Sequence, residues 1–150
     1  MPTVAATGPL DLYDSTLDAL AASSFPALSS APLSAVLLAP NYVPDFALHS
    51  RFADIAAYEV PGGDSLRVLL TGTNVAGAAF FSDDLIFGDP VTVGPVRYLA
   101  LTIGAPNGLS DDSLLIGVAD LSPLGGALEA QCGRFSVAAP AGGWFKISRI

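Results

Sequence analysis

The sequence predicts a mainly β protein: an antiparallel β-sandwich or small barrel, jelly-roll-like, with one short N-terminal helix. Three observations lead to this fold class. Short apolar runs recur through residues 33–147, and clusters of turn residues separate them. The second half of the chain also lacks the helical patterns of about 10–15 residues that a parallel α/β sheet requires. A length of 150 residues suits one domain, so we expect a β-rich domain over residues 10–150 and a flexible arm over residues 1–9.

The helix is expected near the N-terminus. Leu10, Tyr13, Leu17 and Leu20 recur at helical spacing, and three aspartates lie between them on the other side. Aspartates near a helix start also complement its dipole. This pattern predicts a helix over residues 10–22.

Strand signals follow. The apolar run 33–39 is ended by Pro40 and reads as a buried strand, whereas residues 41–56 are expected to form a long loop with a helical turn within 47–54. The other strand candidates are 67–71, 78–81, 85–87, 96–103, 114–119, 128–137 and 144–147. The turn signals between them are Pro61-Gly62-Gly63, Gly88-Asp89-Pro90, Asn107-Gly108 and Gly142-Gly143.

The composition is unusual for a chain that stays alone in solution. Apolar residues make up 51% and charged residues 13%, against a usual charged share of about 25%. Because a soluble monomer normally covers itself with charge, this surface is expected to be largely covered by neighbours. A source genome rich in G and C, which favours Ala, Gly and Pro, accounts for the same composition, and both explanations can hold.

The charge argues against nucleic acid and membrane as partners. The net charge is −8 and the six Lys and Arg residues are dispersed, so no basic stripe is available to neutralise phosphates or anionic lipids. Four prolines interrupt the uncharged stretch 19–44, which rules out a transmembrane helix there because lipid cannot replace the missing backbone donors. The N-terminus lacks the basic and apolar regions of a secretory signal.

Few residues could serve in catalysis. His49 is the only histidine; it could be combined with Ser50 or Ser82, but no G-x-S-x-G motif is present. We therefore expect His49 to be a structural or surface residue. The single Cys132 excludes an internal disulfide, lacks an activating sequence context, and is predicted to be a small buried hydrophobic residue. The sequence predicts no enzyme and no catalytic residues.

Metal and cofactor sites are not predicted either. Asp83-Asp84 and Asp111-Asp112 could bind Ca²⁺ through carboxylate oxygens, but neither pair has EF-hand spacing, and solvated turn residues are the preferred interpretation. One Cys and one His are too few for zinc. The phosphate-binding motifs G-x-x-x-x-G-K-[ST] and G-x-G-x-x-G are absent.

Several short blocks occur in a characteristic order. The first is Leu12-Tyr13-Asp14. The second is a loop with Tyr42, Pro44, His49, Phe52, Asp54 and Ile55. The later blocks are 70–72, 81–87, 94–103, 114–120 and the Gly-rich turn and aromatic strand of residues 142–147.

In the order and spacing of these blocks the chain resembles a family of small tailed-phage virion proteins, described as head, tail-fibre-like or structural proteins. The resemblance covers most of the chain and carries no catalytic residues. The chain departs from the family pattern at residues 135–140, where the family strand ends in V-x-W-D-N-G, and at residues 104–113. These departures concern surface contacts more than the core.

The resemblance implies a structural role: a capsid decoration (cement) protein on the outer surface of the head shell, made in the cytoplasm of the bacterial host. The implied partners are the major capsid protein and copies of the chain itself, as a homotrimer by analogy with phage cement proteins. The acidic charge suits the outer surface, because an inward-facing chain of charge −8 would repel packaged DNA. The alternative is a tail fibre, a spike or another tail component.

Two features are expected to make the contacts. The arm 1–9 could order on a neighbouring subunit, and the loop 41–56 could present Tyr42, Phe46 and Phe52 as anchors, since aromatic residues dominate interface hot spots. The alternative interpretation is that the three rings fold back as a lid over the core.

Two other classes stay open. A sugar- or ligand-binding β-sandwich would need a concave pocket with convergent polar groups. A hydrolase would use Ser82 or Asp84.

Overall fold

The computed structural model describes residues 4–7, 9–22, 28, 30–62 and 66–149. Within them the chain is mainly β, with antiparallel sheets and one α-helix, which confirms the predicted fold class. The strands are β1 (Val4–Thr7), β2 (Leu10–Leu12), β3 (Leu33–Leu38), β4 (Val68–Leu69), β5 (Asn74–Ala76), β6 (Ala79–Phe81), β7 (Leu85–Val96), β8 (Tyr98–Ile103), β9 (Leu115–Asp120), β10 (Leu128–Val137) and β11 (Phe145–Arg149). The helices are α1 (Asp14–Ala21) and the 3-10 turns η1 (Phe52–Asp54), η2 (Ala56–Tyr58) and η4 (Pro106–Gly108).

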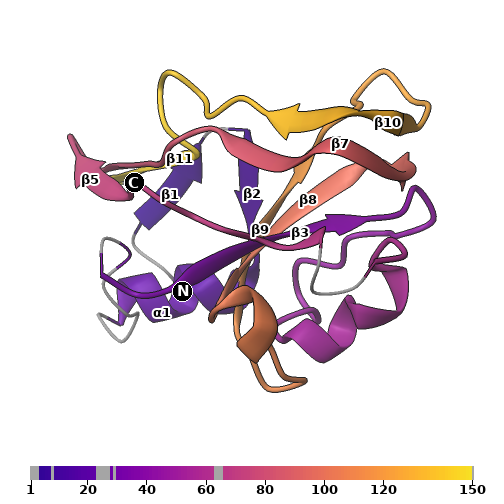
Figure 1. Ribbon diagram of the computed structural model, residues 1–150. Coiled ribbons are helices and arrows are strands. Elements are labelled where there is room, and N and C mark those ends of the chain that lie inside the picture. The colour runs from indigo at the N-terminus through magenta and orange to yellow at the C-terminus, as the bar shows by residue number, and fades with distance from the viewer. Residues whose placement is uncertain (1–3, 8, 23–27, 29, 63–65, 150) are drawn as a thin grey trace.

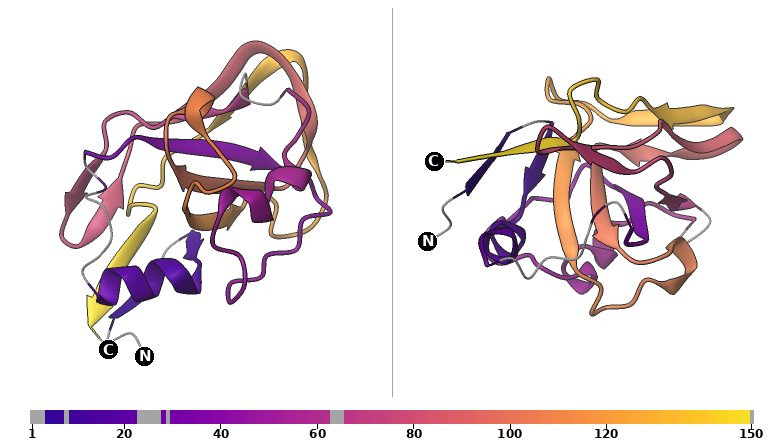
Figure 2. Two further views of the ribbon diagram at one scale, coloured as in Figure 1. Left: turned by 90° about the horizontal axis from the view of Figure 1, so that it is seen from below. Right: turned by 90° about the vertical axis from the view of Figure 1, so that its left-hand side faces the viewer.

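The described strands form two sheets and a ribbon. The larger sheet has the order β2-β9-β8-β3-β4, the smaller one β1-β11-β6-β5, and β7 pairs with β10 in a two-stranded ribbon. All of these strand pairs are antiparallel. Figures 1 and 2 show the ribbon running across the strands β8 and β9, with α1 and the 3-10 turns on the opposite side of the larger sheet.

The larger sheet is buried on both faces. In β3, Leu33, Ala35 and Leu37 belong to a core cluster shared with the ribbon and the smaller sheet, while Val36 and Leu38 belong to a second cluster on the other face. A strand that is covered on both sides needs apolar residues at nearly every position. This is why the run predicted at 33–39 is almost uninterrupted.

The ribbon is strongly irregular. Between its first and last register pairs, β7 advances eleven residues and β10 only nine, with four shifts of register. Each extra residue in one strand is a β-bulge, which bends the strand and increases its twist. The sequence predicts a turn at Gly88-Asp89-Pro90, but these residues lie inside β7, at one of the bulges.

The N-terminal region differs from its prediction. A flexible arm was expected over residues 1–9, but Val4–Thr7 form β1 and pair with β11 of the same chain. A helix was expected over residues 10–22, but Leu10–Leu12 form β2, and α1 begins only at Asp14. The first and third side chains of β2 are buried and the middle one is exposed, so this segment follows the two-residue period of a strand.

Trp144 connects the two sheets. Its backbone carbonyl accepts a hydrogen bond from Leu10 N–H, and its own N–H donates to the Phe80 carbonyl. Its indole Nε1–H donates to Ser82 Oγ at 2.8 Å. Gly143 has a φ of 91°, and a Cβ there would lie 2.8 Å from the Phe80 carbonyl oxygen. The turn can approach β6 this closely only with glycine at this position.

Candidate interaction surface

His49 ends a hydrogen-bonded chain that begins in the core. The hydroxyls of Tyr13 and Tyr42 lie 2.7 Å apart, and Tyr42 Oη lies 2.8 Å from His49 Nδ1. The backbone N–H of Asp45 also donates to Nδ1, at 3.2 Å. Because an amide can only donate, Nδ1 must accept. The Tyr42 hydroxyl therefore donates to His49 and accepts from Tyr13.

This chain of groups is structural in character. Burial raises the pKa of Tyr13 far above its usual range, and the hydrogen bond with Tyr42 adds to the rise. Burial also raises the pKa of Tyr42, so both phenols stay protonated near neutral pH. In the described residues no hydrogen bond connects His49 to a serine hydroxyl or a carboxylate. The arrangement fastens the loop 41–56 to the sheet.

The other sequence candidates for chemistry are engaged separately. Ser82 donates to the Asp83 carbonyl at 2.9 Å. The Asp83 carboxylate accepts from Thr71 Oγ1 at 3.1 Å, and the Asp84 carboxylate accepts from the Ala139 amide at 2.7 Å. Both aspartates hold neighbouring loops together. Across the described ranges, no group of three His, Cys, Asp or Glu side chains could hold a metal ion.

The prediction that Cys132 is buried is wrong. Its side chain is exposed, and its φ of 51° lies in the left-handed region. Its backbone N–H donates to Thr92 Oγ1 across the ribbon at 3.1 Å. Cys132 occupies a bulge of β10, and the bulge keeps its side chain out of the core.

The aromatic residues proposed as anchors lie mainly in the core. Tyr42 and Phe52 are 1% and 5% exposed and pack with Ile55 in the second cluster. Phe46 is half-buried, with its ring centroid 5.5 Å from that of Tyr13. This corresponds to a lid over the core, and Tyr42 and Phe52 are not accessible to a partner here. These rings cover the apolar face of the larger sheet that points away from the ribbon.

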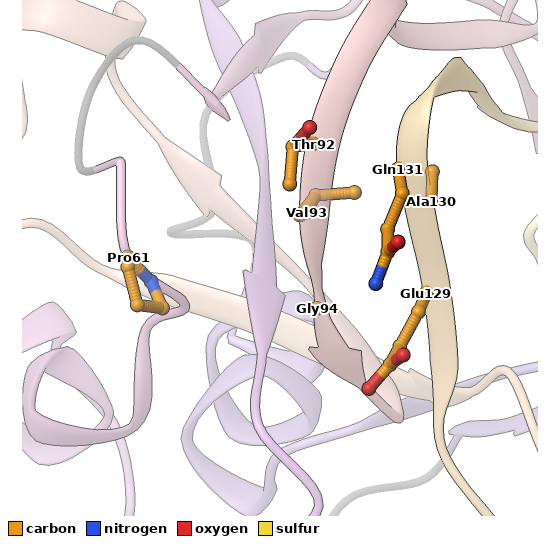
Figure 3. A pocket seen from close by; sticks show the side chains of 7 residues that line it. All are labelled: Pro61, Thr92, Val93, Gly94, Glu129, Ala130 and Gln131. Carbon is orange, nitrogen blue, oxygen red and sulfur yellow. The ribbon is translucent and has the colours of Figure 1, made fainter.

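The described residues form open hollows at the surface, of which one lies beside the ribbon and another beside α1. One, of about 240 Å³, lies between Pro61 and the ribbon. Figure 3 shows the side chains of Glu129 and Gln131 extending from β10 toward β7 in this hollow. The other, of about 430 Å³, lies between β2, α1 and Phe46 and has Asp14 in its lining. Both hollows are open to solvent, unlike the concave sites that bury most of a small ligand.

Exposed apolar side chains occur at both ends of the ribbon. Val75 of the β5–β6 hairpin and Ile86 lie at the end where β7 begins, and Leu124 and Leu128 lie at the other end. Leu124 is fully exposed in the turn before β10. At about 3.3 Å per residue, a ribbon of this length separates the two ends by roughly 30 Å. Figure 1 shows the β5–β6 hairpin and this turn at opposite sides of the molecule.

In the part of the chain that the structure describes, two of the six Lys and Arg side chains form ion pairs with carboxylates of the same chain. Arg67 makes a two-point contact with Glu59 at 2.7 and 2.9 Å. Arg97 contacts Asp120 at 3.1 and 3.3 Å and thereby lowers the pKa of that carboxyl. With these cations paired, the net charge of −8 leaves the surface predominantly acidic.

Asp54 predicts how stability depends on pH. Its carboxylate accepts the backbone N–H groups of Ser50 (2.8 Å) and Arg51 (3.0 Å), and these bonds lower its pKa. A lowered pKa in the folded state contributes stability above the unfolded value of about 3.9, and this contribution is lost as pH falls through the folded pKa. Denaturation of wild type and Asp54→Asn between pH 7 and 2 should show the variant less stable at pH 7, with the difference shrinking toward acid. A difference that stays constant with pH would contradict this.

No protein-family model, curated protein or solved structure matches this chain. Among the described residues, no helix combines the length and apolar character needed to cross a bilayer.

Proposed function

We propose that this chain is a structural protein of a tailed-phage virion that decorates the outer surface of the capsid. The observation that carries the proposal is the pair of exposed apolar sites at the two ends of the ribbon, Val75 with Ile86 and Leu124 with Leu128. A rigid subunit with two separate contact points can bridge two neighbours in a lattice. Anything that binds the assembled shell but not its free subunits shifts the equilibrium toward assembly.

Charge and chemistry support the same role. The acidic surface suits the outside of a shell filled with DNA. The serine, aspartate and histidine side chains that could act in catalysis are tied into separate structural contacts. The block order described from the sequence adds the phage context. Multiple weak contacts, each too small to hold alone, would supply the binding strength through avidity.

The test is binding to purified particles. DNA-filled heads and free tails of a candidate phage are each mixed with the protein, and bound protein is measured by co-sedimentation. We expect saturable binding to heads and a higher temperature of DNA release from decorated heads. Binding to tails alone would support the tail alternative, and binding to neither would overturn both.

Paired variants locate the contact. Val75→Ser removes an exposed apolar side chain at one end of the ribbon, and Leu124→Ser removes one at the other end. The double variant Val75→Ser/Leu124→Ser should bind heads at least about tenfold more weakly than wild type. Leu48→Ser is the matched control, because Leu48 is 76% exposed but lies on the loop 41–56, away from the ribbon. Equal loss for the control and the double variant would argue against the two ribbon ends as the contact.

A further inference from the structure

Among the described strands, none pairs with the outer edge of β10. On its other side β10 pairs with β7. Figure 1 shows β10 at the rim of the molecule, with β7 between it and the rest of the fold. Nine of its ten residues are exposed or only partly buried. A free edge of this kind offers unpaired backbone donors and acceptors to another strand.

The bulge at Cys132 changes which side chains share the outer face. Between the pairs Ala130↔Val93 and Gly133↔Val91, β10 advances three residues while β7 advances two. In a regular strand, residues five apart point to opposite faces. The extra residue in β10 shifts the alternation by one position, so that residues five apart across the bulge point to the same face.

The two charged residues of β10 therefore lie on one face. Glu129 and Arg134 are both exposed, whereas Ala130, Gly133 and Phe135 turn partly or fully inward. Neither charged residue takes part in the ion pairs found within the described ranges. They stand on either side of the bulge, at equal distances from its centre.

This spacing is self-complementary. In an antiparallel pair of two identical strands, placing Glu129 opposite Arg134 of a second copy also places Arg134 opposite Glu129 of that copy. The same register sets Ala130 against Gly133 and Gln131 against Cys132. Directly opposite residues point to the same face, which the bulge makes possible here. Two attractive contacts between opposite charges result, in a protein whose net charge of −8 otherwise opposes self-association.

We propose that two copies of this chain pair antiparallel through their β10 edges, with Glu129 of each copy opposite Arg134 of the other. The pairing joins two ribbons into one four-stranded sheet, β7-β10-β10-β7, about a twofold axis at the bulge. A twofold contact of this type is isologous and closes on itself. It differs from the threefold assembly expected by analogy with cement proteins, and it extends the proposed function without depending on a shell, so each can fail alone.

Cys132 gives a direct readout of the register. It lies beside the twofold axis, so that the two Cys132 Cα atoms come within about 6 Å of each other, given a strand spacing of about 4.8 Å. A short bismaleimide, which alkylates both thiols, should link two copies of the purified protein. We expect one strand pair to bury less than the roughly 800 Å² per partner of a stable complex, so linking should increase with protein concentration. Cys132→Ser should give no linked dimer.

A charge swap tests the pairing itself. Glu129→Arg or Arg134→Glu places like charges opposite each other at both contacts, and each should weaken dimerisation about tenfold. The double variant Glu129→Arg/Arg134→Glu exchanges the two charges and should recover both dimerisation and linking through Cys132. The controls Asp111→Arg and Lys146→Glu make the same changes of charge at exposed positions outside β10 and should have little effect.

The outcomes separate clearly in sedimentation velocity and linking. Wild type that remains monomeric up to about 0.5 mM, where a millimolar contact would be detected, overturns the proposal. So does a double variant that fails to recover although its circular dichroism matches wild type. Linking that is equal in all variants would indicate random collision of exposed thiols and would also overturn it. A trimer in which Cys132 is not linked would favour threefold assembly instead.

Discussion

Replacement of Trp144 by alanine will lower the free energy of unfolding by about 3–5 kcal/mol, the usual cost of deleting a large buried aromatic side chain. Trp144 is 2% exposed and belongs to the larger core cluster. Its loss leaves a cavity where the two sheets meet and also removes the hydrogen bond to Ser82. Denaturant titration followed by far-UV circular dichroism measures the effect.

Two milder variants separate packing from hydrogen bonding. Trp144→Phe retains much of the apolar volume, and Ser82→Ala retains the ring but leaves a buried indole N–H without its acceptor, at a cost of about 1–3 kcal/mol. We expect Trp144→Ala to exceed both. A cost below about 1 kcal/mol for Trp144→Ala would mean that the ring does not support the junction between the sheets.

Tyr42→Phe will cost about 1–3 kcal/mol, because it leaves a buried hydroxyl unsatisfied. Tyr13 is fully buried, and the Tyr42 hydroxyl is its partner. The ring of Tyr42 stays in place in this variant, so packing against Tyr58 and Tyr98 is retained. The decrease in the free energy of unfolding, measured by denaturant titration, therefore reports the removal of the Tyr42 hydroxyl alone.

The costs of the two single variants test the direction of the hydrogen bonds, and the double variant tests whether the two hydroxyls are coupled. Tyr13→Phe alone leaves the bond from Tyr42 to His49 intact and should cost less than Tyr42→Phe. In the Tyr13→Phe background no orphaned hydroxyl remains, so Tyr42→Phe should cost at least about 1 kcal/mol less than it does in wild type. Additive costs would show that the two hydroxyls do not depend on each other.

Much of the sheet framework could be predicted from the chain alone. The runs at 33–39 and 114–119 correspond closely to β3 and β9, because a strand inside a core needs a dense apolar sequence. The run at 128–137 corresponds to β10, although most of this edge strand is exposed. The turn at Gly142-Gly143 before β11 could be predicted from the two residues themselves, because glycine readily adopts the positive φ found at Gly143.

Other elements could not be predicted because partners far along the chain create them. β5 contains no buried residue, and only its pairing with β6 makes it a strand. β1 lacks any period of its own and forms against β11. Three-residue β2 looked like the start of a helix because Leu10 and Tyr13 also fit a helical spacing.

The candidate surface was harder to predict than the fold. Aromatic composition pointed to Tyr42 and Phe52 as anchors, but composition does not say which face of a sheet a loop will cover, and both rings are buried. The free edge of β10 and its bulge at Cys132 depend on the register with β7, which no local pattern encodes. Of the exposed apolar residues, Leu124 has a local signal, since it precedes Gly125-Gly126 in an exposed turn.

The pairing of β1 with β11 also determines when this protein can finish folding. Val4 lies opposite Arg149, so the first described strand must wait for almost the whole chain before it finds its neighbour. Closing so long a loop is entropically costly, and contacts this distant in sequence slow folding. All strands of the larger sheet precede Leu121, so that sheet can pair before β11 is made, whereas β1 has no partner until residues 145–149 are available. The smaller sheet is therefore expected to form after the larger one.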